Sequence, residues 1–436
     1  MDVARGVALL GIFLVNIESF AQPFGRFIVA RPEAGGALTR ACFYVEKVLC
    51  EGKFYPMFSM LFGMGLVLQM GSVERRGGRF VPLYLRRLGV LLLIGTLHAL
   101  LAWYGDILAV YAVCGLLLLP FRKCSAKTLM WIGIGLMLLA TLFFVPASAM
   151  QAMGREQGQV QTAPHEAPSG DAAPATTESG GSEAISRLAE TSSFFALIKG
   201  YMDQRIQGGP EHPVYMELES RAYRDGPWLD AFLFRAMTWF WFLFFVVFCM
   251  GWHILGLFFL GAALLKFDLF GPGRSRLRAR LLSIGLLVGL PGSALGVLLA
   301  AHDGGPLVAA AAGALQMICS PMVALAYICG AAMLCESGRL SGILRLFAAT
   351  GRMALTNYLM QTLIATAIFY WWGLAQFDSW SRPQRATLVL CVFAGQCLLS
   401  LAWISVFRFG PMEYLWRSLT YLRLEPLLRR AAAVVP

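Results

Sequence analysis

Long runs of apolar residues, separated by short polar loops, dominate the chain. Several of these runs exceed the roughly 18 residues that a helix needs to cross the hydrocarbon core of a bilayer. The pattern therefore predicts an all-α integral membrane protein with about ten transmembrane helices. The predicted spans are residues 5–22, 53–71, 87–104, 106–121, 128–147, 240–265, 282–301, 307–334, 353–372 and 386–406.

The charges between the spans predict how the helices are oriented. Arginine and lysine gather in alternate connections, at residues 72–86, 122–127, 267–281 and 335–352, and in the tail from residue 407. Cytoplasmic loops carry such an excess of positive charge. We therefore expect these segments, and both termini, to face the cytoplasm.

One apolar stretch, residues 228–266, is long enough for two crossings. Two crossings would place the basic loop 274–280 and the tail on the wrong side of the membrane. We therefore predict one crossing preceded by an interfacial helix. The aromatic run at residues 239–242 would then lie at the outer interface, where such rings accumulate.

The spans divide the chain into three parts. Residues 1–147 form an N-terminal membrane half of five helices, and residues 228–436 form a C-terminal half of five helices with a cytoplasmic tail. The segment between them, 148–227, is predicted to be periplasmic. Within it, residues 154–182 are rich in Ala, Gly, Pro, Ser, Thr and Glu, which predicts a disordered linker. Residues 183–226 recover helical character and predict surface helices.

Composition agrees with this class, since 58% of the residues are hydrophobic and 14% are charged, whereas soluble domains carry about 25% charged residues. The net charge of +11 would suit nucleic acid. However, the arginines form short clusters between apolar runs, without the basic and aromatic stripe of a nucleic-acid interface. We expect a lipid bilayer as partner and no nucleic acid. The cysteines show no metal-ligand spacing, so no metal site is predicted.

Polar side chains inside membrane spans are costly and are candidates for function. Four lie in the half away from the basic loops: Asn16, Glu18, His98 and Asp106. Asp106 follows a short hairpin after His98, and a carboxylate there would fix the imidazole tautomer and raise its basicity as a general base. Two alternatives are open. In the first, His98 has no catalytic role and simply hydrogen-bonds a neighbouring helix. In the second, Asp106 has no catalytic role and serves as the N-cap of the fourth helix.

A second polar set lies in the half near the basic loops. Its members are Asp2, Arg5, Arg352, Asn357, Gln361, Glu413, Arg417 and Tyr421. Arginines here suit phosphate groups, which they bind bidentately. The alternative is that they reach lipid headgroups and orient the helices. Met1 falls directly on the charged motif that opens the first helix, so we expect the natural start to lie upstream.

Several blocks, in order along nearly the whole chain, carry a resemblance to a known family. They are DVARGVALLGI at residues 2–12, EGKF at 51–54, YGDIL at 104–108, GRMALTNY at 351–358 and GPMEYLWRSLTY at 410–421. With these blocks the chain resembles the YeiB-like family of bacterial membrane proteins, a domain of unknown function. The resemblance implies a multi-pass protein of the bacterial inner (cytoplasmic) membrane.

The first helix is also similar to that of transmembrane acyltransferases, which use a cytoplasmic acyl-CoA and modify an acceptor on the far side. In the sugar O-acetyltransferases a catalytic histidine lies eleven residues after the shared arginine, and here that position is Asn16. If acyl transfer occurs, the resemblance implies that His98 or Glu18 replaces the usual base.

Two functions follow from these residues. In the first, Arg5, Arg352, Asn357 and Arg417 hold an acyl-CoA donor, and His98, oriented by Asp106 near Glu18 and Asn16, activates a small-molecule, glycan or lipid acceptor. The second is transport of a small solute or a lipid-linked molecule, with Asn357, Gln361 and His98 along the pathway. A scaffold or sensor role for 183–226 is a third possibility. The oligomeric state is left open.

Overall fold

The computed structural model describes residues 1–28, 32, 35–162, 213–302 and 304–429. In these residues the regular structure is helical, apart from one isolated bridge between Phe407 and Leu428. The helices are α1 Asp2–Ala21, α2 Phe24–Ile28, α3 Ala37–Leu49, α4 Phe54–Glu74, α5 Phe80–Leu101, α6 Leu108–Leu118, α7 Ala126–Thr162, α10 Pro213–Arg224, α11 Trp228–Phe245, α12 Gly251–Lys266, α13 Ser275–Ile284, α14 Leu290–Ala301, α15 Gly305–Glu336, α16 Ser341–Arg352, α17 Ala354–Phe369, α18 Arg382–Val406 and α19 Pro411–Tyr421. A 3₁₀ turn (η1, Leu119–Lys123) follows α6, and π-helical turns (η2, Val246–Met250; η3, Gly285–Gly289) join α11 to α12 and α13 to α14.

Eight helical segments of the described chain are long and apolar enough to cross a membrane: Asp2–Ala21, Ala37–Glu74, Phe80–Leu101, Ala126–Met150, Trp228–Lys266, Ser275–Ala301, Gly305–Glu336 and Arg382–Val406. Two further predicted spans fall on shorter helices, α6 with 11 residues and α17 with 16. Each predicted span therefore lies on a helix, and the prediction of an all-α membrane protein is confirmed.

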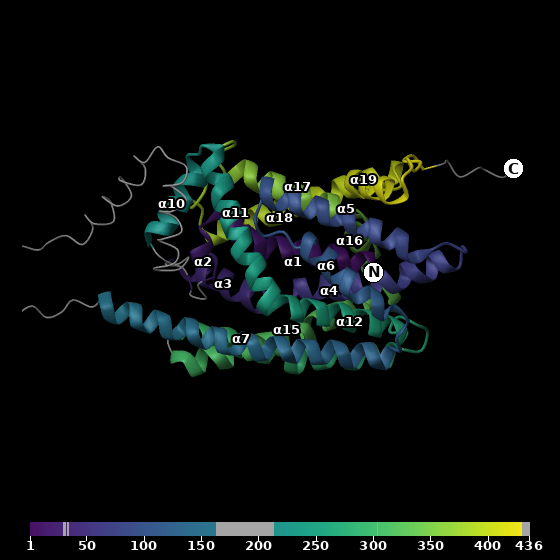
Figure 1. Ribbon diagram of the computed structural model, residues 1–436, viewed down its shortest axis with the longest axis horizontal. Helices are drawn as coiled ribbons and strands as arrows, with labels where there is room; N and C mark the ends of the chain where they lie inside the picture. The colour runs from purple at the N-terminus through teal and green to yellow at the C-terminus, as the bar shows by residue number, and fades with distance from the viewer. Residues whose placement is uncertain (29–31, 33–34, 163–212, 303, 430–436) are drawn as a thin grey trace, which may run out of the picture.

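The ambiguous stretch 228–266 is one continuous helical run. It contains no proline, and the π-helical turn η2 lets α11 continue into α12 without a break. A continuous helix agrees with a single crossing. The separate interfacial helix that we predicted is instead the first part of the same helix, and Figure 1 shows this run passing diagonally through the bundle.

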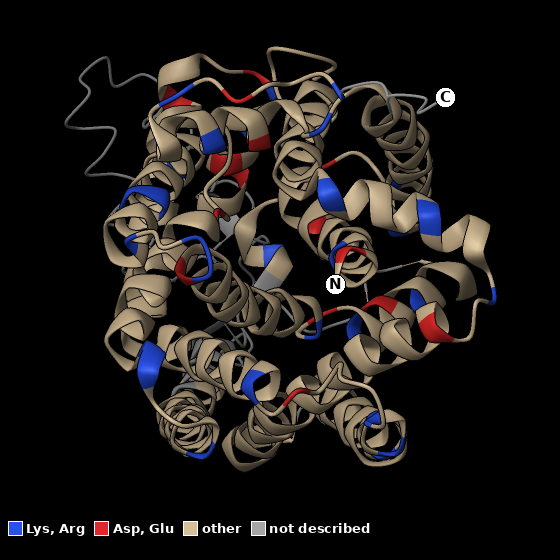
Figure 2. Cartoon of the chain, turned by 90° about the vertical axis from the view of Figure 1, so that its right-hand side faces the viewer, with Lys and Arg blue, Asp and Glu red and all other residues tan. Residues whose placement is uncertain are grey.

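The five segments predicted to face the cytoplasm meet at one end of the bundle, which we call the basic end. Lys266 donates hydrogen bonds to the carbonyls of Arg122 and Cys124, at 2.8 and 2.7 Å. Arg278 pairs with Glu336 at 2.6 Å. Figure 1 places the N-terminus and α19 at this end, and Figure 2, which looks onto it, shows lysine and arginine spread around it. The shared end is what the charge pattern predicted.

The opposite end, which we call the α10 end, is closed by part of the segment between the two halves. The Phe24 amide donates to the Glu219 carboxylate at 3.1 Å, and the Trp371 amide donates to the Tyr223 carbonyl at 2.7 Å. The helix α10 is therefore the described part of the predicted surface helices at 183–226. It holds the α1–α2 corner and the loop after α17.

The first residues of the predicted linker at 154–182 are helical in the structure. Helix α7 continues past the predicted span 128–147 as far as Thr162, through Ala, Met, Gln, Glu and Arg residues that favour helix. The remainder, 163–182, lies outside the described residues, as do residues 183–212 of the predicted surface helices.

Close backbone contact at the basic end explains why the sequence blocks 2–12 and 351–358 each contain a glycine, Gly6 and Gly351. A Cβ atom at Gly6 would lie 2.1 Å from the Phe347 carbonyl oxygen, and one at Gly351 would lie 1.9 Å from the Asp2 carbonyl oxygen. The two glycines therefore let α1 and α16 pack backbone against backbone. Arg5 and Arg352, the neighbours of these glycines, are brought to the same end of the bundle by this contact.

Candidate active site

The predicted pair of His98 and Asp106 is present in the structure. The His98 Nδ1 lies 2.9 Å from the Asp106 Oδ1, and the two side chains are 5% and 0% exposed. Because a carboxylate accepts, Nδ1 carries the proton, and the Nε2 of a neutral imidazole is then the acceptor. The pair is thus arranged as a carboxylate that orients a histidine base.

Asp106 also has the second role that the sequence left open. Its Oδ2 accepts a hydrogen bond from the Ala109 amide at 2.9 Å, which satisfies a free N–H in the first turn of α6. The short connection after α5 makes both contacts possible, because it folds Asp106 back against the last turn of that helix. Asp106 therefore contacts His98 and also caps the first turn of α6.

The imidazole has a third partner, which sequence reasoning missed. The His98 Nε2 lies 2.9 Å from the Thr362 Oγ1, on α17. With Nε2 as acceptor, the Thr362 hydroxyl is the donor. Asp106, His98 and Thr362 thus form a hydrogen-bonded chain of carboxylate, imidazole and hydroxyl. The signal in the sequence was a spacing of four residues between Tyr358, Thr362 and Thr366, which places them on one helix face.

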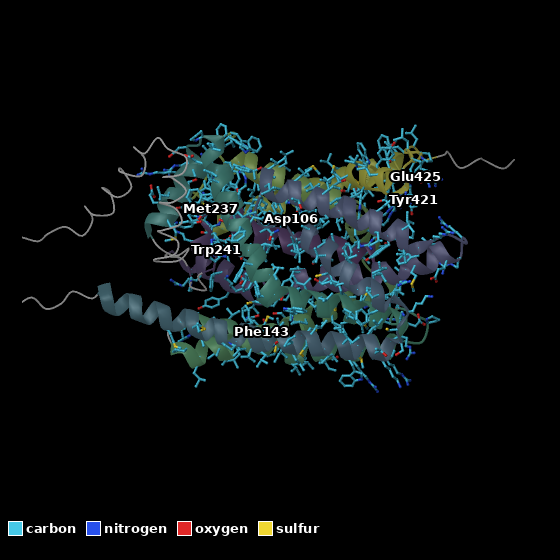
Figure 3. The ribbon with its side chains drawn as sticks, viewed as in Figure 1. Asp106, Phe143, Met237, Trp241, Tyr421 and Glu425 are labelled. Carbon is cyan, nitrogen blue, oxygen red and sulfur yellow. The ribbon has the colours of Figure 1, made fainter. Side chains whose placement is uncertain are left out.

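Aromatic rings surround this chain. The Tyr358 ring lies 5.2 Å and the Trp103 ring 6.3 Å from the imidazole. The Trp103 indole N–H is buried and has no acceptor within the described part of the chain. Arg235, on α11, covers the hairpin by donating to the Leu100 carbonyl at 3.2 Å. Figure 3 places Asp106 inside the bundle, between Met237 toward the α10 end and Tyr421 at the basic end.

Glu18, predicted as a candidate base, lies in a separate ion-pair network. Arg385 donates to both of its carboxylate oxygens, at 3.0 and 2.8 Å, and Arg382 pairs with it at 3.0 Å. Arg382 also pairs with Glu46 at 2.5 Å. Glu18, Glu46, Arg382 and Arg385 therefore form one ion-paired network. Within it Glu18 serves as a counter-ion for the two arginines, and it is not paired with His98.

Asn16, the other candidate on α1, is half-buried, and its side chain makes no hydrogen bond within the described residues. The structure does not bring it into the chain that contains His98.

Asn357 and Gln361 share a face of α17, as the spacing predicted, and this face packs on α18. Asn357 donates to the Ser400 hydroxyl at 2.9 Å, and Gln361 donates to the Gln396 side chain at 3.0 Å. Gln396 in turn donates to the Asn357 carbonyl at 3.0 Å. These side chains form a buried polar layer, so Asn357 is not placed among the arginines of the basic end.

The arginines at the basic end divide into two kinds. Arg352 is exposed and reaches the Arg408 carbonyl at 3.5 Å. Arg417 stacks over the rings of Phe409 and Tyr421, with its guanidinium carbon 4.4 and 5.4 Å from their centres. The first is a surface side chain, and the second is held on an aromatic support.

Arg87, which the sequence reasoning did not select, joins Arg417. Its guanidinium lies 3.8 Å from the centre of the Trp416 ring, and it experiences repulsion from Arg417 and Arg5. Arg5 pairs with Asp2 at 3.1 Å. Among the described residues no carboxylate pairs with Arg87 or Arg417. Positive charge without an acidic partner gathers here, and it suits an anion such as a phosphate group.

Glu413, next to these arginines, is used inside the protein. Its carboxylate accepts from the Leu355 and Thr356 amides at 2.6 and 3.1 Å, and from the Thr356 hydroxyl at 2.6 Å. These contacts cap the first turn of α17. Burial raises the pKa of the Glu413 carboxyl, and the hydrogen bonds that it accepts oppose this effect. Glu413 therefore anchors the helix that carries Thr362.

The described residues contain no group of side chains that would bind a metal ion. Within the part of the chain that the structure describes, no three His, Cys, Asp or Glu side chains come together as metal ligands would. The chemistry that this arrangement offers is proton transfer by a buried, oriented imidazole.

Comparison with known proteins places the chain in a family. Residues 264–423 match the model of the family described as "Protein of unknown function (DUF418)". The chain is 33% identical to the uncharacterized protein YxaH of Bacillus subtilis, over 99% of this chain and 96% of that one. It is 29% identical to the uncharacterized protein YeiB of Escherichia coli, over 99% and 98%. The chain therefore belongs to the DUF418 family of YeiB-like proteins, as the ordered sequence blocks indicated.

Proposed function

We propose that this protein is a membrane acyltransferase, which passes an acyl group from a cytoplasmic acyl-CoA to a hydroxyl acceptor reached from the other side of the membrane. The observation that carries the proposal is the buried chain of Asp106, His98 and Thr362. An imidazole held by a carboxylate and hydrogen-bonded to a hydroxyl is the arrangement that activates a hydroxyl for attack on an acyl group.

The geometry gives each residue a task. Asp106 holds the proton on Nδ1, which leaves the lone pair of the His98 Nε2 directed at a hydroxyl. His98 then takes the hydroxyl proton as the oxygen attacks, and Asp106 stabilises the imidazolium that forms. A positioned general base contributes about 10²–10⁴-fold to the rate. The aromatic surroundings exclude water, which strengthens these electrostatic interactions.

The donor would bind at the basic end. Arg87 and Arg417, held on Trp416 and Phe409, would bind the phosphates of acyl-CoA together with Arg5. Helix α17 begins at this end, and Thr362 lies eight residues after its first residue, a rise of about 12 Å. A long, thin donor arm that follows α17 would span such a distance and bring its acyl group to His98.

The test is acyl transfer by the purified protein in lipid nanodiscs, with radiolabelled acyl-CoA as donor and total lipid and glycan extracts as acceptors. His98→Ala should lower the initial rate by about 10²-fold or more, because the general base is lost. His253→Ala is the matched control, since His253 is also buried but contacts Tyr55 and the Met317 carbonyl without a carboxylate. Its rate per folded molecule should stay near that of the wild type.

The proposal fails if the wild-type protein neither binds acyl-CoA nor transfers its acyl group to any of these acceptors. It also fails if His98→Ala keeps the wild-type rate.

A second candidate is transport of a small solute or a lipid-linked molecule. The polar layer of Asn357, Gln361 and Gln396 between α17 and α18 favours it, because buried polar side chains mark many transport pathways. These amides hydrogen-bond one another, whereas a pathway would need them to face a solute. Flux in sealed vesicles that Gln361→Leu and Gln396→Leu abolish, with His98→Ala unaffected, would favour transport over acyl transfer.

A further inference from the structure

The hydroxyl of Thr362 differs from those of five other helical threonines in the described chain. These five donate to the carbonyl four residues earlier, at 2.7–3.0 Å: Thr141, Thr350, Thr366, Thr387 and Thr420. This back-bonding is the usual behaviour of threonine in a helix. The corresponding distance at Thr362, to the Tyr358 carbonyl, is 3.5 Å, whereas the His98 Nε2 is at 2.9 Å. The Thr362 hydroxyl is therefore directed to the imidazole.

We propose that Thr362 is the nucleophile of the reaction and carries the acyl group as a threonyl ester between the two half-reactions. This inference rests on the acyl transfer proposed above and adds a covalent intermediate to it. An activated nucleophile lies within hydrogen-bond reach of a base that a third group orients. Thr362, His98 and Asp106 meet this description at 2.9 Å for each contact.

The first half-reaction loads the protein. The Thr362 hydroxyl gives its proton to the His98 Nε2 while its oxygen attacks the carbonyl carbon of an acyl thioester. A carbon–oxygen bond forms and the carbon–sulfur bond breaks. The proton passes from His98 to the departing sulfur, so the products are a threonyl ester and a free thiol. No oxidant or reductant is required.

The second half-reaction returns the protein to its starting state. An acceptor hydroxyl gives its proton to the same Nε2, and its oxygen attacks the ester carbonyl carbon. The bond to the Thr362 oxygen breaks, and the proton from His98 restores the threonine hydroxyl. The sum of the two steps is one acyl group moved from a thiol to a hydroxyl.

The place of Thr362 in the bundle suits such a relay. It lies about 12 Å from the start of α17 at the basic end and about 10 Å from its last residue, Phe369, toward the α10 end. A donor from one side and an acceptor from the other would each need to travel only part of the membrane. The ester holds the acyl group while the first product leaves, so the two substrates need not occupy the site together.

The surroundings contain a further group that fits an acyl ligand. The buried indole N–H of Trp103, whose ring lies beside His98, has no acceptor among the described residues. Leaving a buried donor without a partner costs about 1–3 kcal/mol. The carbonyl oxygen of an acyl group bound in this cluster would accept from it.

The test uses the full-length protein in nanodiscs with radiolabelled acyl-CoA and no acceptor. After denaturation, label should remain on the protein, should be released by mild alkali, and should map by mass spectrometry to Thr362. Thr362→Val keeps the branched shape but lacks the hydroxyl, and it should lose the label and at least about 10²-fold of the transfer rate. Thr362→Ser should label.

Thr366→Val is the matched control, because Thr366 lies one turn further along the same helix and is bonded only to backbone carbonyls. It should label like the wild type, and thermal unfolding should show all three variants folded. If Thr362→Val transfers at the wild-type rate while His98→Ala does not, transfer is direct. That result overturns the threonyl ester and leaves the proposed function intact. Label on another residue also overturns it.

Discussion

Two buried polar clusters in the same bundle differ in the partners of their carboxylates. Around Glu18 and Glu46, each carboxylate is paired with a guanidinium, from Arg382 or Arg385. Around His98, one carboxylate holds an imidazole whose other nitrogen meets a neutral hydroxyl. The first cluster neutralises its own charges, so it has no unpaired charge to offer a substrate. The second ends in a group that can give up a proton.

The comparison shows why burial of an ionisable group is not by itself evidence for catalysis. Glu18 is 3% exposed and Asp106 is fully buried, and both looked alike as carboxylates inside predicted spans. Partners separate them. A carboxylate held by two arginines has both oxygens engaged by guanidinium groups, whereas a carboxylate on a histidine controls the tautomer of a base. The predictions below test this separation.

The largest effect is expected from Asp106→Asn. An amide in place of the carboxylate favours the wrong tautomer of His98, and in Ser-His-Asp triads the equivalent change lowers the rate by about 10⁴. We expect a loss of similar size in the initial rate of acyl transfer, with little change in the unfolding temperature. Asp378→Asn, which alters an acidic residue paired with Arg26 outside the site, is the control. A rate near that of the wild type for Asp106→Asn would contradict the role given to Asp106.

The next largest effect concerns stability. Glu18→Ala leaves Arg385 without its carboxylate in a buried place, and breaking a buried pair costs about 3–5 kcal/mol. The free energy of unfolding in detergent should fall by about this amount. Arg26→Ala breaks a pair in which the arginine is 53% exposed, and it should cost less than about 1 kcal/mol.

The same pair offers a double substitution. Replacing Glu18 and Arg385 together with Leu and Met removes both charges, so most of the lost stability should return. If Glu18→Ala is as stable as the wild type yet has lost acyl transfer, Glu18 belongs to the reacting groups and the comparison is wrong.

Much of the fold could be predicted because long apolar runs are recognised as membrane-spanning helices from the local sequence alone, without knowledge of tertiary contacts. Each predicted span lies on a helix, and the basic loops predicted the end at which they gather. The pairing of His98 with Asp106 was also predictable, since only eight residues separate them and a short hairpin must bring them close. Local sequence was enough for both.

The other partners of His98 and Glu18 could not be predicted, because they come from segments that are distant in the sequence. Thr362 lies 264 residues from His98, and threonine is ordinary in a membrane helix, so its four-residue spacing from Tyr358 and Thr366 was too weak a signal to select it. Arg382 and Arg385 precede the predicted span 386–406, so the span prediction does not include them. In the structure they begin α18 and reach Glu18, 367 residues away from Arg385. Without these partners, Glu18 resembled a catalytic carboxylate.

The smallest expected effect comes from a change that adds no charge and removes none. Gly95 lies on α5, and a Cβ atom there would be 2.4 Å from the Ala109 amide nitrogen and 2.7 Å from the Asp106 Oδ2. Gly95→Ala should push α6 and Asp106 away from His98, with an overpacking cost of about 1–3 kcal/mol in the free energy of unfolding. The rate of acyl transfer should fall as well, because the carboxylate would no longer orient the imidazole.

Gly89→Ala is the matched control, since it lies on the same helix and a Cβ atom there meets nothing within 4 Å. Alanine is the better helix former by about 1 kcal/mol, so this variant should be as stable as the wild type or more so. The Glu18 network should be unaffected in both variants, because neither glycine contacts it. If Gly95→Ala is destabilised but transfers acyl groups at the wild-type rate, the position of Asp106 stabilises the hairpin without controlling the base.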